Sequence, residues 1–274
     1  MDNSQNPTLL SQPDPKPLLT PPTPELSLID RFNIKKTKLL SAYYGHPIED
    51  LKLILIIGKH RDLTAQILQG ALTTLGQKSS LFTLKTIPSI SSVHKFFSDS
   101  WKKGSNFVII PSPLLPLTKH TFYGIPIKIL SVTSEFPAKN LPDLTNFCQT
   151  NSAFKHKNHP ETMHINLWCD ATDSKNRTTS PEISQNTLLT TTGFDHKNDI
   201  FLKNLKSYKH GTEATIHCNY EPFKIATFST SENIAESLVS VTAALFSLDF
   251  TKDQIIDAIA DWDTNVDSQK SQKQ

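Results

Sequence analysis

The stretch from Tyr43 to Ala65, YYGHPIEDLKLILIIGKHRDLTA, decides the fold of this chain. Residues 51–57 form a short apolar run rich in β-branched side chains, which predicts a buried strand. A turn follows at once, and apolar residues then recur at helical spacing until Gly76 ends the helix. These apolar positions are Leu63, Ile67, Leu68, Ala71, Leu72 and Leu75. In α/β proteins such a strand, turn and helix often hold a phosphate, because the helix N-terminus offers free N–H groups and a partial positive charge.

The same stretch resembles the start of the central domain of the Mur ligases, most of all the E-type UDP-N-acetylmuramoyl-peptide synthetases. The residues that match the pattern of this family are Tyr44, Gly45, Pro47, Leu51, Lys52, Ile54 and Gly58. The resemblance implies a fold of the P-loop type, and an ATP-dependent amide-forming ligase that uses Mg²⁺. It covers roughly residues 28–266.

The residues that would bind phosphate in this family are replaced here. Laid on the family pattern, the phosphate-binding lysine becomes Asp62, the magnesium-binding hydroxyl becomes Leu63 and the glycine before them becomes Arg61. At ~4 Å and an effective dielectric near 20, two unit charges interact by roughly 4 kcal/mol, so an aspartate here opposes phosphate binding strongly. We therefore expect no ATP or Mg²⁺ cofactor. Aspartate is also a good N-cap residue, so we predict that Asp62 caps the following helix.

What is left of the nucleotide site, by resemblance, is a small set of residues around this turn. Asn233 matches the first asparagine of the helix that borders the adenine pocket in the family, and Glu236 replaces the second. We expect no catalytic residue and no metal ligand. A weak anion site in the basic turn and a solvated turn are both open. The remnant residues are Gly58, Lys59, His60, Arg61, Thr64 and Asn233.

Other catalytic signatures of the family are also changed. The glutamate that follows the third strand is replaced by Ile110 or its neighbour, and residues 131–137 contain no Asp-His pair. The helix expected over residues 147–154 has Asn151 near the place of the modified lysine. By resemblance, a V-P-G-R motif would begin at Val266 but other residues follow it, and we expect the family's C-terminal domain to be absent. Together these changes predict a catalytically degenerate protein.

Composition and spacing divide the chain into three parts. Of its 18 prolines, 7 fall in the first 24 residues, which indicates a disordered Pro-rich leader over residues 1–27. Residues 28–266 form the Mur-like domain, and 267–274 a polar tail. The net charge of +2 gives no case for nucleic-acid binding. With no signal peptide and no membrane span, we expect a cytoplasmic protein with its three cysteines reduced.

The remaining pattern alternates strands with helices, so we expect an α/β fold with a mostly parallel sheet, flanked by helices, and a small antiparallel addition. Helices are expected over 90–101 and 232–248, with a further one opened by a capping box at 251–254. The last two strands should form a hairpin whose turn contains Glu221-Pro222. The further strands are expected at 79–83, 106–110, 126–132, 163–168, 186–191, 213–220 and 223–228.

These features favour a degenerate Mur-ligase-like protein that acts as a binding or interaction module, connected with peptidoglycan precursor synthesis. Its partner would be an intact Mur ligase, another wall-synthesis protein or a second copy. One alternative is a residual ATP-dependent ligase, or a nucleotide or UDP-sugar binder. Another is a plain α/β interaction domain whose Mur likeness is historical only. Absence of the C-terminal domain would expose Ile256, Trp262 and Val266, and we weigh Trp262 equally as an interface residue and as core. His156, His159 and His164 form a local group that an exposed polar loop explains better than a metal site.

Overall fold

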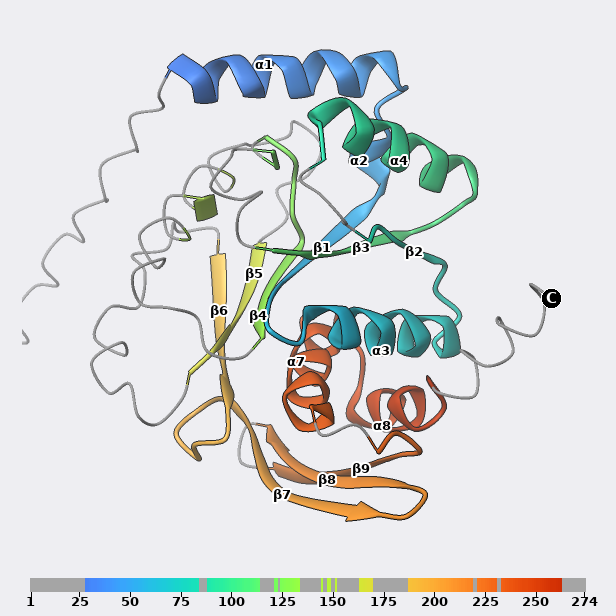
Figure 1. Cartoon of the computed structure of the whole chain (residues 1–274), viewed down its shortest axis with the longest axis vertical. Helices are drawn as coiled ribbons and strands as arrows, with labels where there is room; N and C mark the ends of the chain where they lie inside the picture. Colours follow the sequence, from blue (N-terminus) through green and yellow to red (C-terminus); the bar gives the residue numbers. More distant parts are fainter. Residues whose placement is uncertain are drawn as a thin grey trace, which may run out of the picture.

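A computed structural model of the chain describes residues 28–83, 88–113, 121–122, 124–133, 144, 147–148, 151, 163–169, 187–218, 221–230 and 233–262. Its centre is a nine-stranded sheet in the order β2-β3-β1-β4-β5-β6-β7-β8-β9 (Figure 1). The pairs from β2 to β7 are parallel, whereas β7, β8 and β9 pair antiparallel. The fold class predicted from the sequence is confirmed.

The strands follow the apolar runs of the sequence closely. β1 has five consecutive buried residues, Leu53–Ile57, because both faces of the sheet are covered at its centre. The strands are β1 (Lys52–Gly58), β2 (Ser79–Leu81), β3 (Phe107–Ser112), β4 (Ile129–Thr133), β5 (Met163–Trp168), β6 (Thr187–Gly193), β7 (Ile200–Tyr208), β8 (Gly211–Cys218) and β9 (Glu221–Thr227).

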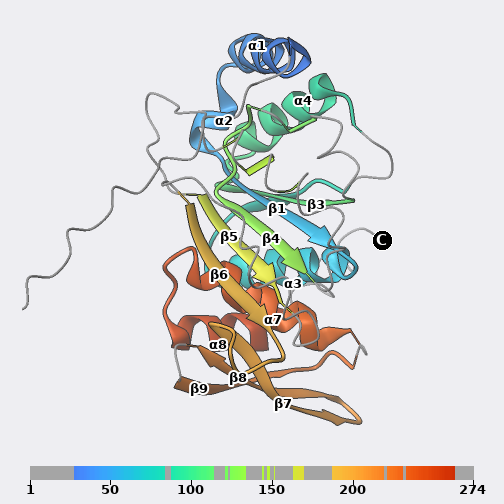
Figure 2. The ribbon, with the colours of Figure 1, turned by 90° about the vertical axis from the view of Figure 1, so that its left-hand side faces the viewer.

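Helices cover both faces of the sheet. Ile54 and Ile56 of β1 belong to the hydrophobic cluster that contains α3, α7 and α8, whereas Leu53, Leu55 and Ile57 belong to the cluster that contains α4. The antiparallel strands curl beneath α7 and α8, as Figure 2 shows from the side. The helices are α1 (Leu28–Tyr43), α2 (Pro47–Asp50), α3 (Arg61–Thr74), α4 (Ile90–Lys102), α7 (Ile234–Phe246) and α8 (Lys252–Ala260).

The sequence pattern missed three elements, α1, the single-turn helix α2 and β7, and misplaced one turn. α1 was missed because, among the side chains of this helix that the structure describes, only those of Ile34, Thr37 and Ser41 are buried, so they form no buried apolar stripe. β7 was missed because most of its outer half is exposed. The predicted turn at Glu221-Pro222 is wrong, since Glu221 pairs with Cys218 and both Glu221 and Pro222 lie inside β9. A proline is tolerated there because β9 is an edge strand.

Trp262 is part of the core, so its predicted role as an interface residue is wrong. It is 5% exposed, and its indole Nε1 donates a hydrogen bond to Thr227 Oγ1 at 2.9 Å. On the other side it packs against α3 so closely that a Cβ on Gly70 would lie 2.9 Å from Trp262 Cβ. Ile256 is half-buried against the same cluster, and Val266 lies outside the described residues. The segment that follows the chain's last described helix therefore closes the core.

Candidate functional site

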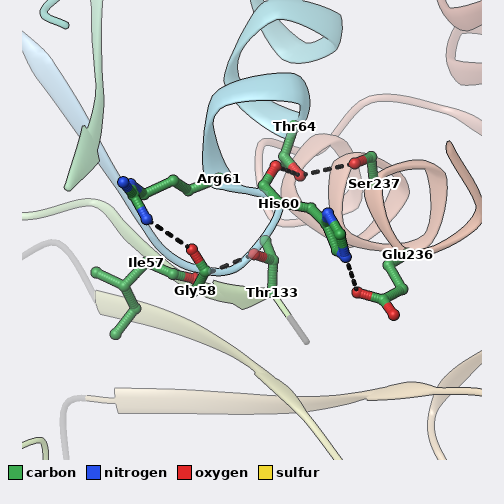
Figure 3. Close-up of polar contacts among 8 residues, drawn as sticks. All are labelled: Ile57, Gly58, His60, Arg61, Thr64, Thr133, Glu236 and Ser237. Atoms are coloured by element: carbon green, nitrogen blue, oxygen red, sulfur yellow. Dashed lines mark hydrogen bonds and ion pairs between the residues drawn. The ribbon is translucent and has the colours of Figure 1, made fainter. Parts of the chain in front are cut away.

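The candidate site is the turn between β1 and α3, at the carboxyl end of the central strand (Figure 3). β1 ends at Gly58 and α3 begins at Arg61, so Lys59 and His60 alone connect them. Lys59 is exposed on this turn, whereas His60 is 8% exposed. His60 occupies the N-cap position of α3 but makes no side-chain cap hydrogen bond. The predicted capping role of Asp62 is therefore wrong: Asp62 lies inside the first turn of the helix.

Gly58 is required by the packing of two strands. Its φ is +121°, a region that favours glycine, and a Cβ at this position would lie 1.9 Å from the backbone oxygen of Thr133. Thr133 is the residue that pairs with Gly58 across β1 and β4, and its Oγ1 donates to the Ile57 carbonyl at 3.2 Å. The close approach of the β1 and β4 backbones therefore explains why glycine is needed here, without any role in phosphate binding.

Two polar contacts join the start of α3 to the start of α7. His60 Nε2 lies 3.1 Å from Glu236 Oε2, and the Glu236 side chain is 25% exposed. Thr64 Oγ1 donates to the His60 carbonyl at 2.9 Å and lies 3.1 Å from Ser237 Oγ, with both hydroxyls buried. Figure 3 shows the His60 and Thr64 side chains turned toward Glu236 and Ser237 of α7. His60 and Thr64 thus contact α7 through Glu236 and Ser237.

The two charged residues of the first turn of α3 also lie close together. Arg61 Nη1 donates to the carbonyl oxygen of Gly58 at 3.1 Å, which folds the guanidinium back onto the end of β1. Arg61 Nη2 is 3.9 Å from Asp62 Oδ2, and the Asp62 side chain is 61% exposed. A carboxylate in the first turn interacts favourably with the helix dipole, and this replaces the capping role expected for Asp62.

The structure brings most of the predicted remnant residues together. Gly58, Lys59, His60, Arg61 and Thr64 share the turn and the first turn of α3. Asn233 is exposed at the N-cap of α7 and makes no side-chain cap hydrogen bond.

Sequence reasoning missed how α7 contributes to this site. Glu236 was noted only as a substituted asparagine, and Ser237 was not noted at all. The sequence of α7 carries a weak signal, because Ser237 is a polar residue in a mostly apolar helix and is buried there.

The chemistry of this turn does not fit Mg-ATP. A phosphate placed here would meet the Asp62 carboxylate in the first turn of α3, and the Glu236 carboxylate that lies against His60. The nearest guanidinium, that of Arg61, is already engaged with the Gly58 carbonyl. Leu63 supplies no oxygen for a metal ion. No step of nucleotide chemistry follows from these residues.

The structure also places other positions that the sequence analysis named. Ile110 is buried in β3, and the buried Asn151 accepts a hydrogen bond from the Gly124 N–H at 3.1 Å. His164 lies in β5, whereas His156 and His159 fall outside the described residues, as do residues 134–137. Within the ranges that the structure describes, no group of three or more His, Cys, Asp or Glu side chains could hold a metal ion.

The three cysteines are free thiols. Burial raises the pKa of the Cys148 thiol to about 12, so this side chain is a neutral part of the core. Burial, with the charges of Asp199 and Glu221, also raises the pKa of Cys218. Neither thiol has the lowered pKa of a reactive cysteine.

Solved structures place the fold in a particular group. The architecture is shared by Mur ligases and folylpolyglutamate synthases. A UDP-N-acetylmuramoyl-L-alanyl-D-glutamate–2,6-diaminopimelate ligase matches with a TM-score of 0.64 and 13% identity, over 84% of this chain and 50% of that one. The fold is thus shared more widely than the E-type pattern of the motif implies.

Two further matches extend the comparison. The UDP-N-acetylmuramoylalanyl-D-glutamyl-2,6-diaminopimelate–D-alanyl-D-alanyl ligase of Acinetobacter baumannii gives a TM-score of 0.59 and 12% identity, over 82% of this chain and 49% of that one. The folylpolyglutamate synthase of Mycobacterium tuberculosis, complexed with ADP, gives 0.57 and 8%, over 83% and 61%. This chain spans about half the length of the two ligases. No protein-family model and no curated protein matches it.

The sequence predicts no membrane-spanning segment, and the length and hydropathy of the helices test this prediction. Among the helices of the described residues, none is both long and apolar enough to cross a bilayer.

Proposed function

We propose that this chain is a Mur-ligase-like domain that works as a binding or interaction module without ligase catalysis, in connection with peptidoglycan precursor synthesis. Its partner is an intact Mur ligase, another wall-synthesis protein or a second copy. The likeness in fold to ligases that act on UDP-N-acetylmuramoyl peptides supports the connection. The altered turn after β1 supports the loss of catalysis.

The observation that carries the proposal is the set of contacts between α3 and α7. Thr64 is the one residue of the turn that keeps a hydroxyl, and that hydroxyl donates to the His60 carbonyl and adjoins Ser237. His60 in turn faces the Glu236 carboxylate at 3.1 Å. A ligase has to hold ATP, place Mg²⁺ on its phosphates and stabilise an acyl phosphate. Here the groups at the equivalent place hold two helices together.

Calorimetric titration with Mg-ATP tests the loss of nucleotide binding. We expect no heat of binding at nucleotide concentrations up to the millimolar range, because the Asp62 and Glu236 carboxylates oppose phosphate. Arg61→Ala is the matched control, since it removes the guanidinium that an anion site in this turn would use. A micromolar dissociation constant that Arg61→Ala weakens would instead support the alternative of a residual nucleotide binder.

The interaction part of the proposal needs its own measurement. Purified full-length Mur ligases, titrated one at a time with this chain and followed by light scattering, should give a complex with at least one of them. Titration with a UDP-N-acetylmuramoyl peptide separates the two descriptions, because a UDP-sugar binder takes up the ligand alone. If the chain stays monomeric with every ligase and binds the UDP-sugar, the interaction module is the wrong description.

A further inference from the structure

α1 presents an apolar stripe to solvent. The residues that it buries against the rest of the molecule are Ile34, Thr37 and Ser41, all on one side of the helix. At about 100° per residue, five large apolar residues cluster on the opposite side within an arc of about 100°. They are Leu28, Ile29, Phe32, Leu39 and Tyr43, with exposed fractions of 83%, 64%, 66%, 73% and 80%. The exposed stripe is larger and more apolar than the buried one.

This concentration is particular to α1. The described part of the chain has ten exposed large hydrophobic residues, and five of them belong to this one helix. The other five are scattered singly over α4, β6, β7 and the segments that follow β6 and β9. Scattered apolar residues are ordinary on a protein surface, whereas a contiguous stripe marks a binding surface.

The exposed side of α1 is also strongly basic. Arg31, Lys35, Lys36 and Lys38 are all exposed, and the sequence of the helix contains a single acidic residue, Asp30. Lys36 falls within the apolar arc, and Lys35 lies at its border. The whole chain has a net charge of only +2, so this helix holds a local excess of positive charge.

We propose that α1 is a docking helix for an anionic lipid membrane. A helix with an apolar stripe bordered by Lys and Arg lies in the interface plane, with its apolar side chains among the acyl chains and its cations at the headgroups. α1 lies at one end of the molecule, across the top in Figure 1 and end-on in Figure 2, where a flat surface can reach its outer side. Through this helix the domain binds the membrane peripherally, without crossing it.

Charge favours a membrane over a second copy of the chain. An α1–α1 contact between two copies would bring two sets of four cations together, with Lys36 inside each apolar stripe. Like charges that face each other across an interface are unfavourable. A bilayer that contains anionic lipid instead offers a negative surface together with an apolar layer beneath it.

The apolar stripe is tested with the full chain and sedimented vesicles. We expect binding to vesicles of phosphatidylcholine with phosphatidylglycerol, and at least tenfold weaker binding to phosphatidylcholine alone. Phe32→Ala with Leu39→Ala should weaken binding at least tenfold, because each change removes apolar groups that the bilayer would bury. The matched control is Phe228→Ala with Leu188→Ala, since Phe228 has the same exposed fraction as Phe32, 66%, on another element. This control pair should leave binding unchanged.

The charge is tested by a second pair of variants. Lys35→Gln with Lys36→Gln should weaken binding about 25-fold, from about fivefold for each cation near the surface. Lys206→Gln with Lys209→Gln, on β7 and the turn after it, removes the same charge from another place on the molecule and should have no comparable effect. Thermal melts by circular dichroism should be the same for all four variants, because the substituted residues lie at the surface.

Three results would overturn the proposal. The first is no binding to anionic vesicles, and the second is an equal loss in the control pairs. The third is a dimer in light scattering that Phe32→Ala with Leu39→Ala dissociates, which would assign the stripe to a second copy. The Mg-ATP titration does not bear on these results, so the membrane proposal and the loss of nucleotide binding can fail separately.

Discussion

The segments on either side of β1 differ in where their side chains point. At its carboxyl end, the usual place for ligands in α/β folds, His60, Arg61 and Thr64 turn inward to contacts within the chain. Beyond its amino end, α1 turns its large apolar side chains outward. A fold that usually binds ligand at one end of the sheet thus offers its open surface at the other end. Binding capacity has to be judged from which groups are already satisfied, because the fold alone does not determine function.

The largest effect should come from removing the residue that anchors α3. Trp262→Ala takes away a nearly fully buried indole that packs on Gly70 and donates to Thr227. We expect the free energy of unfolding to fall by about 3–5 kcal/mol. Chemical denaturation measures the loss, and light scattering of the folded variant should show the same oligomeric state as the unaltered protein. A changed oligomeric state with little loss of stability would contradict the core role and support an interface role for Trp262.

Gly58→Ala probes the closed end of the sheet directly. The added Cβ would overlap the Thr133 carbonyl at 1.9 Å, and φ is +121°, so β1 and β4 have to separate. Backbone strain and overpacking together should cost roughly 2–4 kcal/mol, measured by chemical denaturation. Gly76→Ala is the matched control, because Gly76 also has a positive φ, +71°, but nothing lies within 4 Å of its Cβ position. Equal losses in both variants would show that strain alone, and not the close approach to Thr133, requires Gly58.

His94 makes the other end of the molecule sensitive to acid. It lies in α4, which contacts α1 and α2, and burial lowers its pKa from 6.5 to about 4. Below pH 6.5 the His94 imidazole therefore becomes protonated in the unfolded chain, whereas in the folded chain it stays neutral down to about pH 4. The stability is full above pH 6.5 and is lost as the pH falls toward 4, by about 2 kcal/mol between pH 6.5 and 5.

The acid sensitivity of His94 is measured by unfolding across this pH range. His94→Leu should flatten the profile between pH 6.5 and 5, since the carboxylates titrate mainly below that window. His210→Leu, in the exposed turn between β7 and β8, is the control for removing a histidine from the surface. A slope that persists in His94→Leu would assign the acid sensitivity to other groups.

The smallest effect concerns Asp62. Its carboxylate lies in the first turn of α3, beside Arg61 and 61% exposed, so it contributes through the helix dipole and not as a cap. Asp62→Ala should lower stability by about 0.3–1 kcal/mol at low salt, and less at high salt because exposed charges are screened. Asp62→Asn separates charge from shape when the same unfolding curves are measured. Stability that rises in Asp62→Ala would mean that repulsion from Glu236 outweighs the helix dipole.

Much of the fold could be predicted because its signals are local. β1 is a continuous apolar run, α3 has apolar residues at helical spacing up to Gly76, and the capping box of α8 is present with Thr251 and Gln254 as predicted. α1 could not be predicted in this way, since three small or medium side chains hold it to the body. Its more regular stripe faces solvent, and a sequence pattern does not say which face of a helix is covered.

The candidate site divides in the same manner. The sequence by itself determined which residues follow β1 and that a carboxylate, that of Asp62, comes four positions after Gly58, because these facts depend only on chain order. Tertiary structure alone decided that Glu236 and Ser237 meet His60 and Thr64, since these residues lie more than 170 positions apart and are joined only by the packing of α3 on α7. The same holds for Gly58. This position has no room for a side chain because the backbone of β4, 75 positions away in the sequence, lies against it, and no local pattern encodes a contact of that range.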